Sequence, residues 1–159
     1  MKMNFLNRFI NFFNSEPKHP TEIIHKFLKL SRSKRVILSV IYENAILVEI
    51  DSFRYAEFWF PVLKISNKKY KNGFAIYFVI NQKNILNDEN YNRYKNSDLK
   101  LIELDENIEN VKVKTFVKAL EQTRDSAHLG REIKNIIEKV YFFEEQNPNV
   151  YFKIQIIPK

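Results

Sequence analysis

The stretch VILSVIYENAILVEID, residues 36–51, decides which fold this chain can adopt. Apolar side chains follow its two halves, Val36–Tyr42 and Ala45–Asp51, with the period of two that is typical of β-strands. The Glu43-Asn44 pair between the halves has the length of a tight hairpin turn. We therefore expect an antiparallel hairpin at this point of the chain.

The next segment, FRYAEFWFP at residues 53–61, holds the single tryptophan and four other aromatic residues. Aromatic residues are enriched in strands, so we predict a third strand over residues 54–66. Alternation assigns the segment to two faces, with Phe53, Tyr55, Trp59 and Pro61 on one and Arg54, Ala56, Phe58 and Phe60 on the other. A strand with two apolar faces needs cover on both, and the cover comes from the fold or from a partner.

Further elements follow from the same patterns. The segment 67–73 ends in Asn-Gly, a strong hairpin signal, and leads to a strand at 74–81. We also predict strands at 99–104 and 150–157, and helices at 1–14, 21–30 (capped by Thr21), 88–94 and 125–143. Residues 111–120 fit a strand or the start of a helix. The chain 1–159 is thus expected to form a single α+β domain, a two-layer sandwich with helices packed on one face of an antiparallel meander sheet.

Composition excludes several classes of function. The chain has two glycines and no cysteine. Loops that cradle phosphates or dinucleotides need glycine, and disulfides, thiolate nucleophiles and common zinc sites need cysteine. The lack of cysteine fits a reducing compartment, so we expect a cytoplasmic protein. Asn7, Arg8 and Asn11 interrupt the apolar run at 1–13, which predicts an amphipathic helix rather than a secretory signal. No stretch approaches the ~18 apolar residues of a membrane span.

Candidate catalytic residues are few. The three histidines, His19, His25 and His128, lack the spacing of metal ligands and are expected to be surface or structural residues. Metal-dependent nucleases place acidic clusters on sheets, and Glu49, Asp51 and Glu57 could form one. The lysine partner that such sites use is missing next to Glu57. We therefore expect these acids to lie on the solvated outer face of the sheet.

The formal net charge of +7 is concentrated in two regions, residues 1–40 and 67–100. In the second region basic residues interleave with tyrosines, as in Lys68–Lys71 and Tyr91–Lys95. Such a pattern can contact phosphates while the rings stack on bases. Nucleic-acid binding is therefore an alternative function for this chain.

The order of elements over about residues 21–143, with the segment FRYAEFWFP, resembles small bacterial secretion chaperones and immunity proteins to secreted toxins. The resemblance implies a protein that neutralises or escorts a partner and has no catalytic constellation. We predict a non-enzymatic protein-binding module without cofactor or metal. The expected partner-binding residues are Arg54, Tyr55, Trp59, Phe60, Lys64, Lys68, Lys69 and Lys71. Arginine and aromatic residues dominate interfaces, and a basic rim favours an acidic partner. A second copy of the chain is a further candidate partner.

Overall fold

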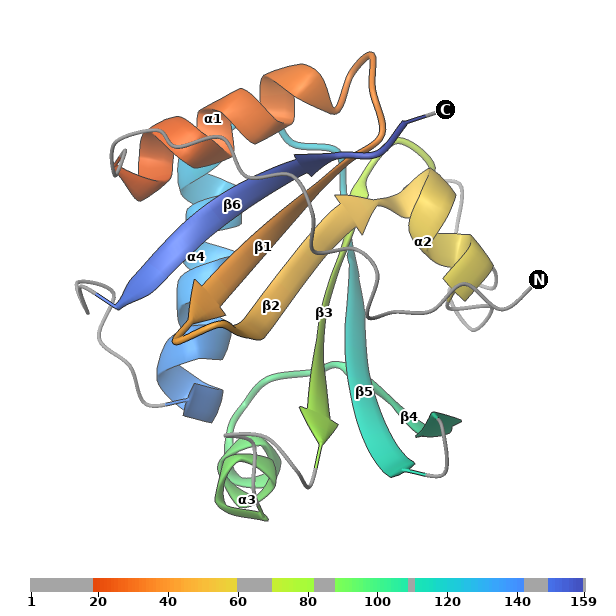
Figure 1. The fold of residues 1–159 in the computed structure, drawn as a ribbon, viewed down its shortest axis with the longest axis vertical. Coiled ribbons are helices and arrows are strands. Elements are labelled where there is room, and N and C mark those ends of the chain that lie inside the picture. Colours follow the sequence, from red (N-terminus) through yellow and green to blue (C-terminus); the bar gives the residue numbers. More distant parts are fainter. Residues whose placement is uncertain (1–18, 60–69, 82–87, 109–110, 142–148, 159) are drawn as a thin grey trace.

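A computed structural model of the chain describes residues 19–59, 70–81, 88–108, 111–141 and 149–158. The elements in chain order are α1 (Pro20–Leu30), β1 (Val36–Tyr42), β2 (Ala45–Ser52), α2 (Phe53–Trp59), β3 (Phe74–Asn81), α3 (Asp88–Asn96), β4 (Ile102–Ile108), β5 (Val111–Leu120), α4 (Ser126–Ile136), the π-helical turn η4 (Ile137–Tyr141) and β6 (Val150–Ile156). The strands form one antiparallel sheet with the order β4-β5-β3-β2-β1-β6 (Figure 1). The predicted α+β class is confirmed.

The expected hairpin of β1 and β2 is present, with Tyr42 paired to Ala45. Glu43 and Asn44 have φ angles of 45° and 71°. Two positive φ values in a two-residue loop are typical of a type I′ turn, whose twist matches that of the paired strands. The hairpin supplies the two strands around which the rest of the sheet is built.

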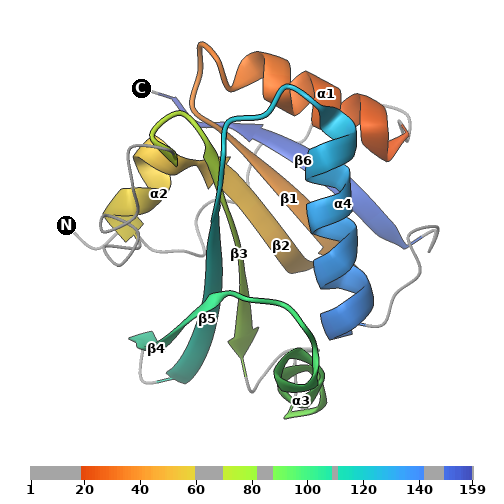
Figure 2. The same cartoon turned by 180° about the vertical axis from the view of Figure 1, so that it is seen from behind.

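One face of the sheet is covered by α1 and α4, which both lie in front of the strands in Figure 2. Alternate strand residues point into this layer and join a core with Ile24, Phe27 and Leu28 of α1. From α4 the core receives Leu129, Ile133 and Ile136. Burial of these side chains fixes the orientation of both helices, so their opposite faces are presented to solvent.

The prediction of a third strand is wrong in the part of this segment that the structure describes, because Phe53–Trp59 forms the helix α2. Strand β2 pairs directly with β3, with Ser52 opposite Phe74, and this leaves no place for a strand between them. The segment packs instead on the face of the sheet away from α1 and α4. There Phe53 and Ala56, three residues apart, join a second small core. Residues 60–66 lie outside the described part of the chain.

Other boundaries differ from the sequence patterns in smaller ways. Residues 111–120 are a strand throughout, and the strand predicted at 99–104 begins at Ile102. The cap of α1 is His19, whose Nδ1 accepts from the Thr21 amide at 3.4 Å, so the predicted Thr21 cap is wrong. The helix predicted at 125–143 begins at Ser126 and changes to the π form at Ile137. The predicted helix at 1–14 lies outside the described residues.

Candidate partner-binding surface

Helix α2 is anchored to the sheet by its first turn. The Phe53 amide donates to the Gly73 carbonyl oxygen at 2.9 Å, and the Phe53 ring lies 6.2 Å from the Tyr70 ring between centroids. Phe53 and Ala56 are buried against a group of residues from β3 and β5, namely Ala75, Tyr77 and Val117. The turn at 70–73 therefore lies beside the start of α2, where the Arg54 side chain is exposed.

Two arginines contact the ring of Tyr55 near the start of this helix. The guanidinium carbon of Arg35 lies 4.7 Å from the centroid of the Tyr55 ring, and that of Arg54 lies 5.1 Å from it. Arg54 Nη2 also donates to the Tyr55 hydroxyl at 3.4 Å. Contacts between a guanidinium and an aromatic face contribute about 0.5–1 kcal/mol at exposed sites. The three side chains therefore form one ordered group.

Arg35 is in an ion pair, whereas Arg54 is not in one among the described residues. Arg35 Nη2 donates to Asp51 Oδ2 at 3.2 Å, and the Asp51 side chain is only 2% exposed. A buried carboxylate needs such a partner, so this ion pair belongs to the fold. Within the described residues Arg54 makes no ion pair and is exposed. Its positive charge is available to a ligand.

Lys71 is exposed in the turn beside α2. The structure thus places three predicted site residues, Arg54, Tyr55 and Lys71, on two adjoining segments. It adds Arg35, which is not among the partner-binding residues predicted from the sequence. We call these four residues the α2 surface. Trp59 is the last residue of α2, and Phe60, Lys64, Lys68 and Lys69 lie outside the described residues.

Glu49 and Asp51, two of the acidic residues considered for a nuclease, are buried, so the expectation that they lie on a solvated face is wrong. Glu49 is 8% exposed and Asp51 1% exposed. Ser39 Oγ donates to Glu49 Oε1 at 3.1 Å, while Asp51 accepts from Arg35 and from the Ser52 amide. Glu57 belongs to α2 rather than to a neighbouring strand. Among the residues that the structure describes, no cluster of histidine and acidic side chains could hold a metal ion.

The two tyrosines of α3 make contacts within the fold that occupy the rings expected to stack on bases. The Tyr91 hydroxyl donates to Glu103 Oε1 at 3.0 Å, and its ring lies under the ammonium groups of Lys95 and Lys114. Tyr94 is buried against Phe116, with ring centroids 4.3 Å apart. The interleaved basic and aromatic pattern at 91–95 therefore does not form the stacking platform that the sequence suggested.

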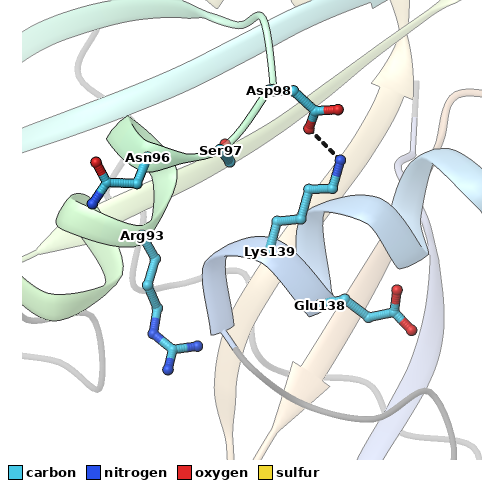
Figure 3. Close-up of a pocket in the computed structure, with 6 residues that line it drawn as sticks. All are labelled: Arg93, Asn96, Ser97, Asp98, Glu138 and Lys139. Atoms are coloured by element: carbon cyan, nitrogen blue, oxygen red, sulfur yellow. Dashed lines mark hydrogen bonds and ion pairs between the residues drawn. The ribbon is translucent and has the colours of Figure 1, made fainter.

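A shallow hollow lies between the end of α3 and the π-helical turn (Figure 3). It is lined by Arg93, Asn96, Ser97, Asp98, Glu138 and Lys139. Lys139 Nζ donates to Asp98 across it and lowers the pKa of the Asp98 carboxyl. Opposite charges thus neutralise each other inside the hollow, and no group of one sign converges there.

A comparison with known protein families, curated proteins and solved structures finds no match for this chain. In the described part of the chain, no helix has the length and apolar character needed to cross a membrane.

Proposed function

We propose that this protein is a non-enzymatic, cytoplasmic protein-binding module that takes an acidic partner protein on the α2 surface. The proposal rests on one observation, the convergence of Arg35 and Arg54 on the Tyr55 ring, with the exposed Lys71 in the adjoining turn. That it neutralises or escorts this partner is proposed only from the resemblance in element order to immunity and chaperone proteins, one segment of which, Phe53–Trp59, is a helix and not a strand.

The physical basis is the kind of side chain gathered there. Arginine and tyrosine are the residues that most often dominate binding energy at interfaces. The Tyr55 ring is already ordered by two guanidinium groups, so binding loses little side-chain entropy. The exposed charges of Arg54 and Lys71 favour carboxylates on the partner and accelerate association.

Site-specific cross-linking is the experiment that tests this proposal. A photoreactive phenylalanine analogue at position 71 leaves the three stacked side chains intact and reports what lies against the turn. We expect it to capture an acidic protein in cells of the source organism, to be identified by mass spectrometry. With that protein purified, Arg54→Glu should weaken its affinity by about tenfold or more, mainly through slower association.

Lys100→Glu is the matched control, because Lys100 is exposed and lies outside the α2 surface. It makes the same change in net charge and should alter affinity by less than about twofold. Equal losses for Arg54→Glu and Lys100→Glu would show that only overall charge matters. That result, or capture of basic proteins alone, contradicts the proposal.

A further inference from the structure

A row of cations follows the solvent face of α1 and the turn after it. Lys26, Lys29 and Arg32 recur at intervals of three residues, and Lys34 follows two residues later. Residues three or four apart lie on the same side of a helix. All four side chains are exposed, and within the described residues none of them makes an ion pair. The row is therefore a ridge of positive charge without ion pairs among the described residues, and the exposed Glu22 lies on the same side of α1, one turn before Lys26.

The ridge is held rigidly. The Leu30 carbonyl accepts from the amides of Ser33 and Lys34 at 3.1 and 3.0 Å, which fixes the turn. The opposite side of α1 is anchored by Phe27, which is completely buried. The cations near the end of α1 also face the negative end of the helix dipole, where positive charge is favourable.

Helix α4 adds to the same side of the molecule, because α1 and α4 cover the same face of the sheet (Figure 2). Arg131 on α4, and Arg124 two residues before the first residue of α4, are exposed and make no ion pair in the described part of the chain. Glu132 on α4 and Glu138 on η4 are both in ion pairs. Glu132 accepts from Lys118 at 2.9 Å, and Glu138 lies 3.7 Å from Lys134. We call Lys26, Lys29, Arg32, Lys34, Arg124 and Arg131 the basic helix surface.

This surface offers charge without an apolar anchor. The large hydrophobic side chains that are exposed in the described residues are Ile102, Tyr151 and Ile156, and all three lie on strands. Protein interfaces usually need a buried aromatic or aliphatic centre. Binding to a phosphodiester backbone does not, because neutralisation of phosphates and release of counterions supply the free energy.

We propose that the basic helix surface binds the phosphate backbone of duplex nucleic acid without reading its sequence. This site shares no residue with the α2 surface, although Lys34 is followed in the chain by Arg35. Helix α2 packs on the opposite face of the sheet from α1 and α4. The contacts are to phosphates, because lysine and arginine side chains on a helix face reach the backbone of a duplex without entering its grooves.

Fluorescence anisotropy with a labelled 20-base-pair DNA duplex of mixed sequence tests the proposal, with the full chain titrated at several salt concentrations. We expect binding that weakens steeply with salt. The triple variant Lys26→Gln/Lys29→Gln/Arg32→Gln should lose affinity by about tenfold or more and lower the slope of log K against log salt by about 2–3. A second duplex of unrelated sequence should bind equally well.

The matched control is Arg54→Gln/Lys71→Gln/Lys100→Gln, which removes three exposed cations outside α1 and α4 and gives the same net charge. It should bind the duplex as the wild type does. The charge-preserving variant Lys26→Arg/Lys29→Arg, with Arg32 kept, should retain both affinity and salt slope, which separates charge from fold.

Three results would overturn the proposal. One is no duplex binding at low salt, and another is an equal loss for both triple variants. The third is binding of poly-glutamate as tightly as duplex, which would assign this surface to acidic proteins. The proposed partner binding on the α2 surface is tested by a different variant. Arg54→Glu tests that binding and leaves all six residues of the basic helix surface unchanged.

Discussion

The two glycines of this chain are expected to respond in opposite ways to the same substitution. A Cβ at Gly73 would lie 1.9 Å from the Leu120 carbonyl oxygen, so Gly73→Ala forces two strands apart. A Cβ at Gly130 would lie 3.6 Å from Ile24 Cδ1, an ordinary contact. Gly73→Ala should cost about 2–4 kcal/mol of unfolding free energy. Gly130→Ala should add about 0.5–1 kcal/mol, because alanine favours the helix.

Urea unfolding of both variants, followed by circular dichroism, measures the two changes side by side. A stable Gly73→Ala protein with a wild-type unfolding midpoint would mean that the close approach of β3 and β5 at this point is not required.

Asn44 is expected to be sensitive to side-chain shape rather than polarity. Its φ of 71° is accessible to asparagine and glycine but strained for a β-branched residue. Asn44→Val should destabilise the protein by about 1–2 kcal/mol. Asn44→Gly, the control at the same position, should be neutral or stabilising by up to about 0.5 kcal/mol. Similar unfolding midpoints for the valine and glycine variants would contradict a type I′ turn.

These residues also show where local sequence reasoning succeeds and fails. The Glu43-Asn44 turn could be predicted because loop length between two alternating segments fixes it. The Asn-Gly pattern predicts that Gly73 is needed for the backbone angles of a hairpin turn, yet its φ is not positive. It is required by the Leu120 backbone, which is far away in sequence. A constraint of that kind cannot be seen in a local pattern.

At the scale of elements, the segment FRYAEFWFP is the largest departure from expectation. Its aromatic content favoured a strand, but it contains no β-branched residue, and Phe53 and Ala56 also fit one face of a helix. Tertiary structure decides between the two, because β3 takes the place beside β2. The structure brings the guanidinium groups of Arg54 and Arg35 over the Tyr55 ring, and whether these side chains bind a partner stays a prediction. Arg35 could not be found, since only the folded chain brings it over Tyr55.

The docking of α3 on the sheet edge depends on Glu103. Partial burial by itself would raise the pKa of this carboxyl, but hydrogen bonds from Lys114, Lys95 and Tyr91 outweigh it and lower the pKa to about 2. The carboxylate accepts from Lys114 at 2.8 Å and from Lys95 at 2.9 Å. The ionised form of Glu103 thus links α3 to β4 and β5.

A pKa below the ordinary value of 4.5 means that Glu103 stabilises the fold fully above about pH 5. This contribution is lost as the pH falls from 4.5 towards 2. Glu103→Gln should therefore lower the unfolding free energy at pH 7 by about 1 kcal/mol, after allowance for solvent screening. The difference between variant and wild type should shrink as the pH is lowered, in urea titrations at pH 7, 4 and 2.5.

Asp105→Asn is the control for that pH series, because the Asp105 side chain is 79% exposed and joins the same network only through Lys114. It should change the unfolding free energy less than Glu103→Gln does. A difference between Glu103→Gln and wild type that stays constant from pH 7 to pH 2.5 would show that the ionised carboxylate is not the stabilising form.

At the scale of the whole molecule, the sheet separates two surfaces of different character. The α2 surface combines tyrosine with arginine, and the basic helix surface on the other face carries only cations. The net charge of +7 could be predicted to favour anionic ligands, but not how the charge would be divided. That division follows from which helices cover which face.

The outer strand β6 is expected to depend on Lys153 to remain unpaired with other molecules. In the described part of the chain β6 pairs with β1 alone, and its sequence VYFKIQI carries one charge, at Lys153. Tyr151 and Ile156 on the same strand are exposed. Edge strands commonly use a lysine to prevent pairing with a second chain. Without it, this segment has the composition of an aggregation-prone strand.

Lys153→Val should therefore cause more self-association than the wild type shows at about 10–100 µM. Multi-angle light scattering measures the change, and thioflavin T fluorescence reports whether the associated form is cross-β. Lys153→Arg keeps the charge and should behave as the wild type. Because Lys153 also interacts within the fold, the unfolding midpoint of each variant is measured in parallel. A folded Lys153→Val protein that stays in the wild-type size distribution would show that the charge does not protect this edge.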